Sequence, residues 1–318
     1  MTNTAQGAQL GLGLAALGRP GYMTLGHARD LGDHDMAAME RRCHEVLDAA
    51  WQAGVRWFDA ARSYGEAERF LASWLTARES DLVGPGAVTV SSKWGYTYVA
   101  NWQPIAKEHE IKDHSLAALE RQIVESQAIL GRHLSLYQVH SATLESGILD
   151  DTRVLARLGA LRDGGLPIGL SVSGARQRET VERALAVRVD GRPLFSAVQA
   201  TWNLLERAVE PALRAAKAAG LRVLVKEPLA NGRLAQAAPL LVTQAAARLN
   251  VGPDAVALAA VLAQPFVDVV LSGAVTTAQL AANVRARDLD GAALATELLP
   301  LVEPADRYWQ ERSQLAWS

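Results

Sequence analysis

The feature that most constrains this chain is a repeated alternation of short apolar segments with longer segments of helical periodicity. The short segments are apolar or β-branched and predict strands, whereas the longer ones predict helices that commonly stop at glycines. The predicted strands lie within 11–18 and at 55–58, 87–92, 134–139, 168–171, 196–199, 221–225 and 267–271. The predicted helices cover 36–53, 67–77, 115–130, 151–162, 179–187, 207–219, parts of 241–264, and 277–286.

This order of elements predicts an α/β protein with a parallel sheet and helices outside it. Eight strand–helix units in 318 residues suit a closed (β/α)8 TIM barrel better than an open sheet. No linker-like or low-complexity stretch divides the chain, so we expect one domain over residues 1–318.

Composition narrows the class of protein. Hydrophobic residues make up 49% of the chain, which is enough for a sizeable core, and the net charge of -2 gives no indication of a nucleic-acid or membrane-surface partner. No apolar run approaches the roughly 20 residues of a membrane span, and Met1–Gln9 lacks the regions of a signal peptide. A single cysteine, Cys43, excludes an internal disulfide and is expected to pack in a helix. We therefore expect a soluble, cytoplasmic protein.

A G-x-G-x-x-A pattern at 11–16 invites comparison with a dinucleotide-binding motif, which needs a strand before it and a helix starting within it. Only ten polar or mixed residues precede it, and Gly18–Gly21 would break a helix. An opening strand followed by a flexible loop to about Asp35 is the better interpretation.

Ionisable side chains end three successive predicted strands. Asp59, Lys93 and His140 follow strands two, three and four, and Tyr64 lies in the loop after Asp59. Each alone has an ordinary explanation, such as a helix cap, a solvent-exposed lysine or a hydrogen-bonded histidine. Because the active site of a barrel lies at the carboxyl ends of its strands, the four together predict an acid–base site.

Segments 58–65, 91–93 and 137–140, with this order and spacing, resemble the catalytic segments of the aldo-keto reductases. The resemblance implies a (β/α)8 barrel and an NAD(P)(H)-dependent oxidoreductase acting on an aldehyde, ketone or sugar lactol. Tyr64 would be the general acid and base, with its pKa lowered by Lys93. Asp59 would hold Lys93 charged, and neutral His140 would polarise the substrate oxygen.

The resemblance also implies where the cofactor lies. Ser171 and Gln199 correspond to residues that hold the nicotinamide carboxamide, although Val172 stands where the family usually has asparagine. Segment 226–232 resembles the loop over the pyrophosphate, and 272–280 with Asn283 resembles the adenosine-phosphate loop at a helix N-terminus. The implied cofactor-binding residues are Ser171, Gln199, Lys226, Pro228, Leu229, Gly232, Ser272, Gly273, Ala274, Thr276, Gln279 and Asn283.

The choice between the two nicotinamide cofactors stays open from these residues. Members of the family that use NADP commonly carry a cation in the adenosine-phosphate loop, where this chain has Val275 and Gln279. Arg285 or Arg287 could reach a 2′-phosphate instead. The resemblance favours NADP(H), with NAD(H) as the alternative.

Aromatic residues cluster after Lys93, and Trp94, Tyr96 and Trp102 predict a wall for an apolar or ring-shaped carbonyl compound or sugar. The alternative is that they pack beneath a long loop. His109 and His114 are five apart rather than the four that share a helical face, so we predict no metal site. The terminal segment 308–317 either folds over the pocket or packs on the barrel exterior.

The residues also allow two other functions. Lys93 could form a Schiff base in a barrel lyase or isomerase, but pairing with Asp59 disfavours this role. The chain could also be a non-catalytic, cofactor-binding subunit. No pattern in the sequence indicates the oligomeric state.

Overall fold

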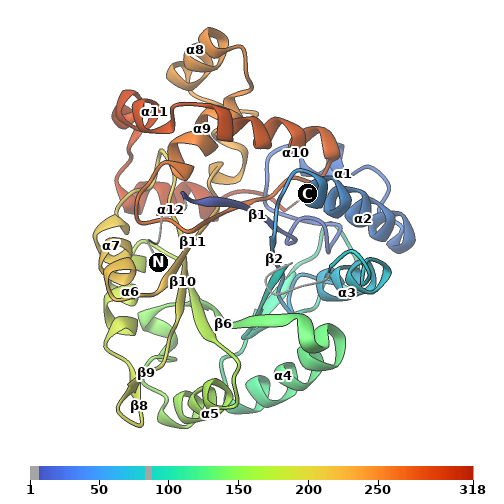
Figure 1. Cartoon of the computed structure of the whole chain (residues 1–318), viewed down its shortest axis with the longest axis vertical. Helices are drawn as coiled ribbons and strands as arrows, with labels where there is room; N and C mark the ends of the chain where they lie inside the picture. Colours follow the sequence, from blue (N-terminus) through green and yellow to red (C-terminus); the bar gives the residue numbers. More distant parts are fainter. Residues whose placement is uncertain (1–6, 83–87, 318) are drawn as a thin grey trace.

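The computed structural model describes residues 7–82 and 88–317, and eight parallel strands in it close into a barrel surrounded by helices (Figure 1). The barrel strands are β1 Gln9–Gly13, β2 Trp57–Asp59, β3 Thr89–Trp94, β6 Leu134–Ala142, β7 Ile168–Val172, β10 Ala197–Thr201, β11 Arg222–Lys226 and β12 Val269–Ser272. Strand β1 pairs with both β2 and β12, which closes the ring. The predicted fold class is confirmed.

The helices follow the strands around the outside of the barrel. They are α1 His27–Leu31, α2 Met36–Gln52, α3 Ala67–Ala77, α4 Leu116–Leu130, α5 Thr152–Asp163, α6 Gln177–Leu185, α7 Glu210–Ala218, α8 Leu240–Leu249, α9 Pro253–Leu262, α10 Thr277–Val284, α11 Gly291–Glu297 and α12 Ala305–Ser313. Short 3₁₀ turns lie at Gly131–His133, Leu144–Ser146, Ala230–Gly232, Arg285–Asp288 and Leu299–Leu301. Several helices begin at side-chain caps, as where Asp35 accepts from the backbone N–H groups of Ala37 and Ala38.

Differences from the predicted elements are local. The segment expected to be a flexible loop contains α1, because His27 and Leu31 are buried and hold this turn against the barrel. The helical segments predicted within 241–264 are confirmed as α8 and α9, which are bent by 94° relative to each other, and α8 begins one residue earlier, at Leu240. Two hairpins also form, β4 Tyr96–Tyr98 with β5 Glu110–Lys112 and β8 Arg188–Val189 with β9 Arg192–Pro193. Ala87, the predicted start of a strand, lies outside the described residues.

The interior of the barrel is layered, because alternate side chains along each strand point inward. A separate apolar cluster comprises Trp57, Leu136, Ala197, Leu224, Val269 and Leu271. Two residues further along their strands stand Asp59, Gln138, Gln199 and Lys226. The apolar layer therefore supports a polar layer at the carboxyl ends of the strands.

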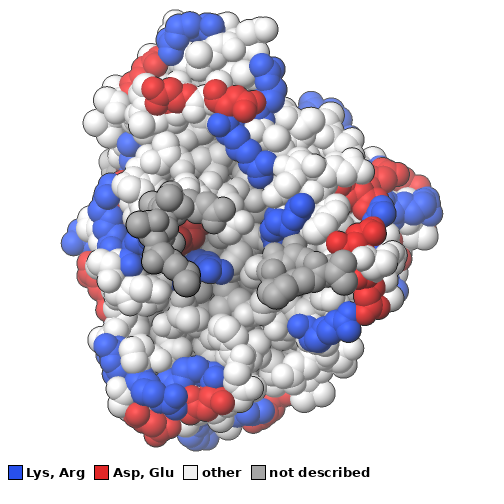
Figure 2. All heavy atoms as spheres, in the orientation of Figure 1, with Lys and Arg blue, Asp and Glu red and all other residues white. Residues whose placement is uncertain are grey.

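Among the described residues, no single helix is long and apolar enough to cross a membrane; α8 and α9 pass that test only when taken together. Figure 2 shows acidic and basic side chains interspersed over the outer helices on the face in view. Many of these charges pair within or between helices, as Arg178 does with Glu182 and Arg157 with Glu120.

Candidate active site

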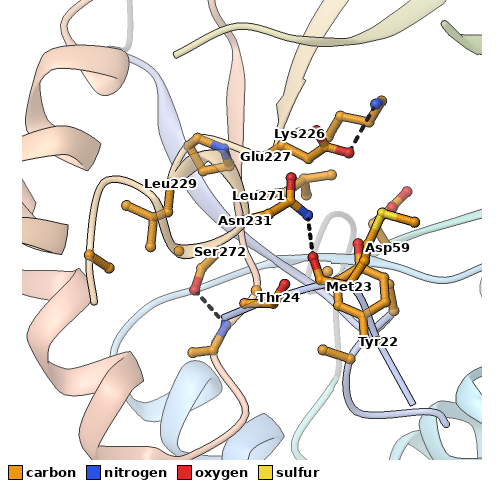
Figure 3. A pocket seen from close by; sticks show the side chains of 18 of the residues that line it. Tyr22, Met23, Thr24, Asp59, Lys226, Glu227, Leu229, Asn231, Leu271 and Ser272 are labelled. Atoms are coloured by element: carbon orange, nitrogen blue, oxygen red, sulfur yellow. Dashed lines mark hydrogen bonds and ion pairs between the residues drawn. The ribbon is translucent and has the colours of Figure 1, made fainter. Parts of the chain in front are cut away.

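A cavity of about 430 Å³ lies at the carboxyl ends of the strands (Figure 3). Tyr64 and His140 line it together with Ser272 and Asn283, so it joins the predicted catalytic residues to the β12–α10 loop. Its volume falls within the usual range for small-molecule sites.

The four predicted catalytic residues converge. Lys93 Nζ donates to Asp59 Oδ2, to the Ala60 carbonyl at 3.0 Å and to the Tyr64 hydroxyl at 3.3 Å. His140 Nε2 lies 3.4 Å from the same hydroxyl. The phenol of Tyr64 thus stands between an ammonium group and an imidazole ring.

Asp59 is held by donors from several strands. Besides Lys93, it accepts from Ser91 Oγ at 2.6 Å, Gln138 Nε2 at 3.2 Å and Gln199 Nε2 at 3.1 Å, all to Oδ1. These contacts fix the carboxylate in the barrel, so it orients the ammonium of Lys93. Gln199, expected from the resemblance to hold a carboxamide, lines the cavity while donating to Asp59.

The pKa of Tyr64 is raised well above its ordinary value, first by burial and second by the negative charge of Asp59. Arg19 acts in the opposite direction. The pKa therefore shifts in the direction opposite to the expected lowering by Lys93, because burial and then the carboxylate of Asp59 both disfavour the phenolate. Tyr64 consequently keeps its proton at neutral pH.

The pKa of His140 is lowered well below 6.5, first by burial and then by the positive charges of Lys93 and Arg19. The ring is therefore neutral near pH 7, as the sequence predicted. The Tyr96 ring packs against it with centroids 4.9 Å apart. A neutral imidazole can donate one hydrogen bond from a ring N–H.

A second layer of contacts holds the Tyr64 loop. Glu68 of α3, which is buried, accepts from Arg62 Nη1 at 2.8 Å, from Ser126 Oγ at 2.7 Å and from Ser92 Oγ. Arg62 lies in the loop before Tyr64, and its N–H donates to the Lys93 carbonyl at 3.0 Å. Glu68 therefore links the loop carrying Tyr64 to the strand carrying Lys93.

Two glycines allow this loop to approach the segment after β1. A Cβ added at Gly18 would lie 2.3 Å from the Tyr64 carbonyl oxygen, and Gly65 has a φ of +59°. The Gly18 carbonyl also accepts from the Glu66 N–H at 2.8 Å. Side chains at these two positions would push Tyr64 out of place.

Most of the predicted cofactor-binding residues line the cavity, and these are Gln199, Lys226, Pro228, Leu229, Gly232, Ser272, Gly273, Ala274, Gln279 and Asn283. Ser171 and Thr276 do not. Ser171 Oγ accepts from the Ser141 N–H at 2.8 Å, and Thr276 caps α10 by accepting from the Gln279 N–H at 3.1 Å.

The residues fit an elongated dinucleotide lying along the cavity. Asn231, in the loop after β11, donates to the Met23 carbonyl at 3.1 Å and accepts from the Leu25 N–H at 3.1 Å, so this loop is tied to segment 23–25 beside the cavity (Figure 3). At the β12–α10 loop, no heavy atom lies within 4 Å of a Cβ built at Gly273. An open backbone at a helix N-terminus is suited to phosphate.

Lys226 stands at the end of β11 within a charged cluster. Its Nζ donates to Thr201 Oγ1 at 2.8 Å and lies 3.5 Å from Glu227, which Arg312 of α12 also contacts. Burial lowers the pKa of Lys226 to about 8. Burial alone would raise the pKa of Glu227, but Arg312 and Lys226 lower it to about 2, so the carboxylate stays ionised.

The structure brings none of the three predicted substrate-wall residues into the cavity lining. Trp94 is fully buried in the core, because it follows inward-facing Lys93 and so points outward. Trp102 donates through Nε1 to the His34 carbonyl at 2.7 Å. Tyr96 reaches the site indirectly, through its contact with His140.

The cavity wall near Tyr64 includes Arg19, which the sequence did not single out, and Trp317 of the terminal segment. Arg19 lies with its guanidinium carbon 5.1 Å from the Tyr64 ring centroid and pairs with Glu110 at 2.8 Å. Trp317 stacks on His109 with centroids 4.1 Å apart, and Arg19 lies over it at 4.7 Å. Of the two positions left open for the terminal segment, the structure shows the one over the pocket. The aromatic and basic residues of segment 308–317 were the feature of the sequence that indicated this position over the pocket.

Within the described residues, no group of histidine, cysteine and carboxylate side chains is arranged to hold a metal ion. Cys43 is buried in α2, and burial raises the pKa of its thiol.

Residues 10–294 match the model of the Aldo/keto reductase family. Among solved structures, the chain is similar to an aldo-keto reductase from Bacillus halodurans in its holo form, with a TM-score of 0.66, 21% identity and 93% of each chain covered. It is also similar to two structures from Pseudomonas aeruginosa assigned to the same family. These have TM-scores of 0.62 and 0.63 and identities of 24% and 25%, covering 91% of this chain and 91% and 92% of theirs. None of the curated proteins compared matches the chain.

Proposed function

The chain belongs to the aldo/keto reductase family, and we propose from its site that it is a nicotinamide-dependent oxidoreductase in which Tyr64 is the general acid and base. Its substrate class would be a small aldehyde, ketone or sugar lactol. The proposal covers NADH and NADPH alike.

One observation carries the proposal. The Tyr64 hydroxyl lies 3.3 Å from Lys93 Nζ and 3.4 Å from His140 Nε2, and Tyr64 lines the same cavity as the loop before α10. A proton donor and a candidate binding site for a phosphate-bearing cofactor therefore lie in one cavity.

The bound nicotinamide would supply or accept the hydride. Tyr64, whose pKa burial and Asp59 raise above its ordinary value, is protonated at neutral pH and would donate that proton to a carbonyl oxygen during reduction. Lys93 stabilises the phenolate that remains, and Asp59 keeps Lys93 oriented toward it. His140 orients the same oxygen through a neutral ring.

The contacts of Lys93 disfavour a Schiff-base mechanism. Its ammonium donates to Asp59, Ala60 and Tyr64, and its side chain is fully buried. A Schiff-base lysine needs a free amine exposed to substrate. All four catalytic groups are present and in contact, which favours an enzyme over a non-catalytic subunit.

The test is Tyr64→Phe, assayed by nicotinamide absorbance against a panel of aldehydes, ketones and sugars. Because general acid catalysis contributes roughly 100-fold or more, we expect turnover to fall by at least that factor while the cofactor still binds. Tyr98→Phe is the matched control, since Tyr98 does not line the cavity. A folded Tyr64→Phe protein with near wild-type turnover would refute the proposal.

A further inference from the structure

The end of the cavity at the β12–α10 loop carries carboxylates. Asp254, in the first turn of α9, lines the cavity and accepts from Asn283 Nδ2 at 2.6 Å. Asp30 of α1 accepts from Nε2 of Gln279, another lining residue, at 2.8 Å. One acidic side chain, Asp254, thus lines the cavity, and a second, Asp30, contacts a lining residue from behind.

The first of these carboxylates ends a chain of hydrogen bonds. The Ala274 N–H donates to Ser272 Oγ at 3.2 Å, and Ser272 donates in turn to Asn283 Oδ1 at 2.7 Å. Asn283 then donates to Asp254, whose second oxygen has no partner among these contacts. This arrangement presents Asp254 as an acceptor for a hydroxyl group in the cavity.

The second carboxylate acts through Gln279. The Gln279 Oε1 accepts from the Val275 N–H at 2.9 Å, while its Nε2 donates to Asp30. The uncharged amide of Gln279 therefore accepts the hydrogen bond of the Val275 N–H, which would otherwise be available to bind an anion. Behind it, Asp30 brings negative charge where a bound phosphate would need positive charge.

Among the described residues, the lysine and arginine side chains that line the cavity do not come from the β12–α10 loop. They are Arg19, Lys226 and Arg312. Arg19 lies over the Tyr64 ring, and both Lys226 and Arg312 pair with Glu227.

The arginines nearest in sequence to this end do not line the cavity. Arg29 pairs with Asp30 at 2.9 Å through a side chain that is 74% exposed. Arg287 donates to the Ala53 carbonyl at 2.6 Å, and Arg285 is exposed. The two candidates named from the sequence, Arg285 and Arg287, are therefore not in the cavity wall.

We propose that the adenosine ribose is bound here with a free 2′-hydroxyl, so that the chain uses NAD(H) in preference to NADP(H). Asp254 accepts a hydrogen bond from a ribose hydroxyl, the contact that an acidic residue makes with the ribose in NAD sites of the unrelated Rossmann fold. A 2′-phosphate carries close to two negative charges, which the Asp30–Gln279 pair and Asp254 disfavour. The inference rests on the proposed function and reverses the preference that the family resemblance implied.

The test measures the dissociation constants of NADH and NADPH for the purified protein by fluorescence titration, alongside turnover with each. We expect NADH to bind at least about tenfold more tightly, a modest factor for a charge mismatch at a site. Equal or tighter binding of NADPH overturns the inference and leaves the proposed function intact. If neither cofactor binds, the proposed function itself fails.

The double substitution Asp30→Asn with Gln279→Arg should remove a negative charge and add a positive one. We expect the ratio of NADPH affinity to NADH affinity to rise by about tenfold or more. Glu297→Gln, which removes an acidic charge on α11 far from the cavity, is the control and should alter neither constant. An unchanged affinity ratio in a folded double variant would count against the proposal.

Arg29→Ala tests one of the exposed cations near this end of the cavity. We expect this change to leave NADPH affinity unchanged or to weaken it by less than about twofold. A large loss confined to NADPH would identify Arg29 as a phosphate ligand and overturn the inference.

Discussion

In the proposed reaction, proton transfer involves two side chains, Tyr64 and His140, whose pKa values are displaced in opposite directions. Burial and Asp59 keep the proton on Tyr64, whereas burial and the cations Lys93 and Arg19 keep a proton off the His140 ring. Both residues therefore hold the state that reduction requires across neutral pH.

The opposite pKa shifts of Tyr64 and His140 predict that kcat/KM for reduction depends little on pH near neutrality. The pKa of His140 is lowered, so the ring stays neutral as pH falls through 6.5 and charges only at a more acid pH. We expect kcat/KM to change little between about pH 5.5 and 7.5, measured in buffers of constant ionic strength. An ionisation near 6.5 that disappears in His140→Asn but persists in the control His133→Asn would contradict this. A change in kcat/KM near pH 8 would instead indicate the ionisation of Lys226, whose pKa is lowered to about 8.

Among the elements, α3 has the closest influence on catalytic geometry. Its buried Glu68 accepts from Arg62 of the Tyr64 loop, from Ser92 of β3 and from Ser126 of α4. A single carboxylate thus joins three segments around Lys93.

Replacing Glu68 with glutamine should both destabilise the fold and slow the reaction. The new amide would face Arg62 with an N–H group, and breaking a buried charge pair costs about 3 kcal/mol or more. We also expect kcat to fall about tenfold without a change in cofactor affinity, because Tyr64 would shift relative to Lys93. Urea unfolding and steady-state kinetics measure the two effects.

Glu125→Gln provides the matched control for Glu68. Glu125 contacts the same Arg62 at 2.9 Å, but its side chain is 38% exposed. Exposed ion pairs contribute at most about 1 kcal/mol, so this change should affect stability and kcat only slightly. Equal effects of the two substitutions would show that burial at Glu68 does not matter.

At the scale of the whole molecule, the last segment of the chain closes the cavity formed by the barrel. Helix α12 is anchored through Arg312 to Glu227 and through the Tyr308 hydroxyl, which accepts from Asn203 Nδ2 at 3.0 Å. Trp317 then reaches the cavity wall beside Arg19.

Removing the Trp317 ring should weaken substrate binding selectively. Loss of its contacts with His109 and Arg19 opens the wall near Tyr64, and contacts of this kind are worth about 1 kcal/mol or more. We expect Trp317→Ala to raise KM for the carbonyl substrate severalfold and to leave cofactor affinity unchanged. Trp51→Ala, on the outer helix α2, should change neither; a parallel rise there would indicate a general loss of stability.

The whole fold should also be sensitive to acid. Burial lowers the pKa of both His27 and His114 from 6.5 to about 4. Between these pH values the unfolded chain binds more protons, so the free energy of unfolding decreases as pH falls through 6.5 and the loss is complete below about 4. At about pH 5 the loss approaches roughly 2 kcal/mol per histidine relative to neutral pH.

His27→Leu should reduce this acid sensitivity. The His27 ring is buried, and its Nε2 has no hydrogen-bond partner, so an apolar side chain of similar size suits the position. Urea midpoints at neutral pH and near pH 5 would measure the effect. A pH dependence as steep as that of the wild type would show that His27 contributes nothing to it.

The sequence alone predicted the barrel and the four residues that meet at Tyr64. Both follow from local order, because strand–helix periodicity sets the fold class and the ends of parallel strands meet at one edge. The alternation of side chains along a strand also predicts that Trp94 points away from the barrel interior, because it directly follows the inward-facing Lys93.

Only the tertiary structure decided which distant segments line the cavity and what charge they bring. Arg19, Asp254 and Trp317 come from three parts of the chain, and no local pattern links them. The pairing of Gln279 with Asp30 and the upward shift in the pKa of Tyr64 are decided in the same way. Hydrogen bonding and desolvation depend on distances between packed segments, and these distances exist only after the chain has folded.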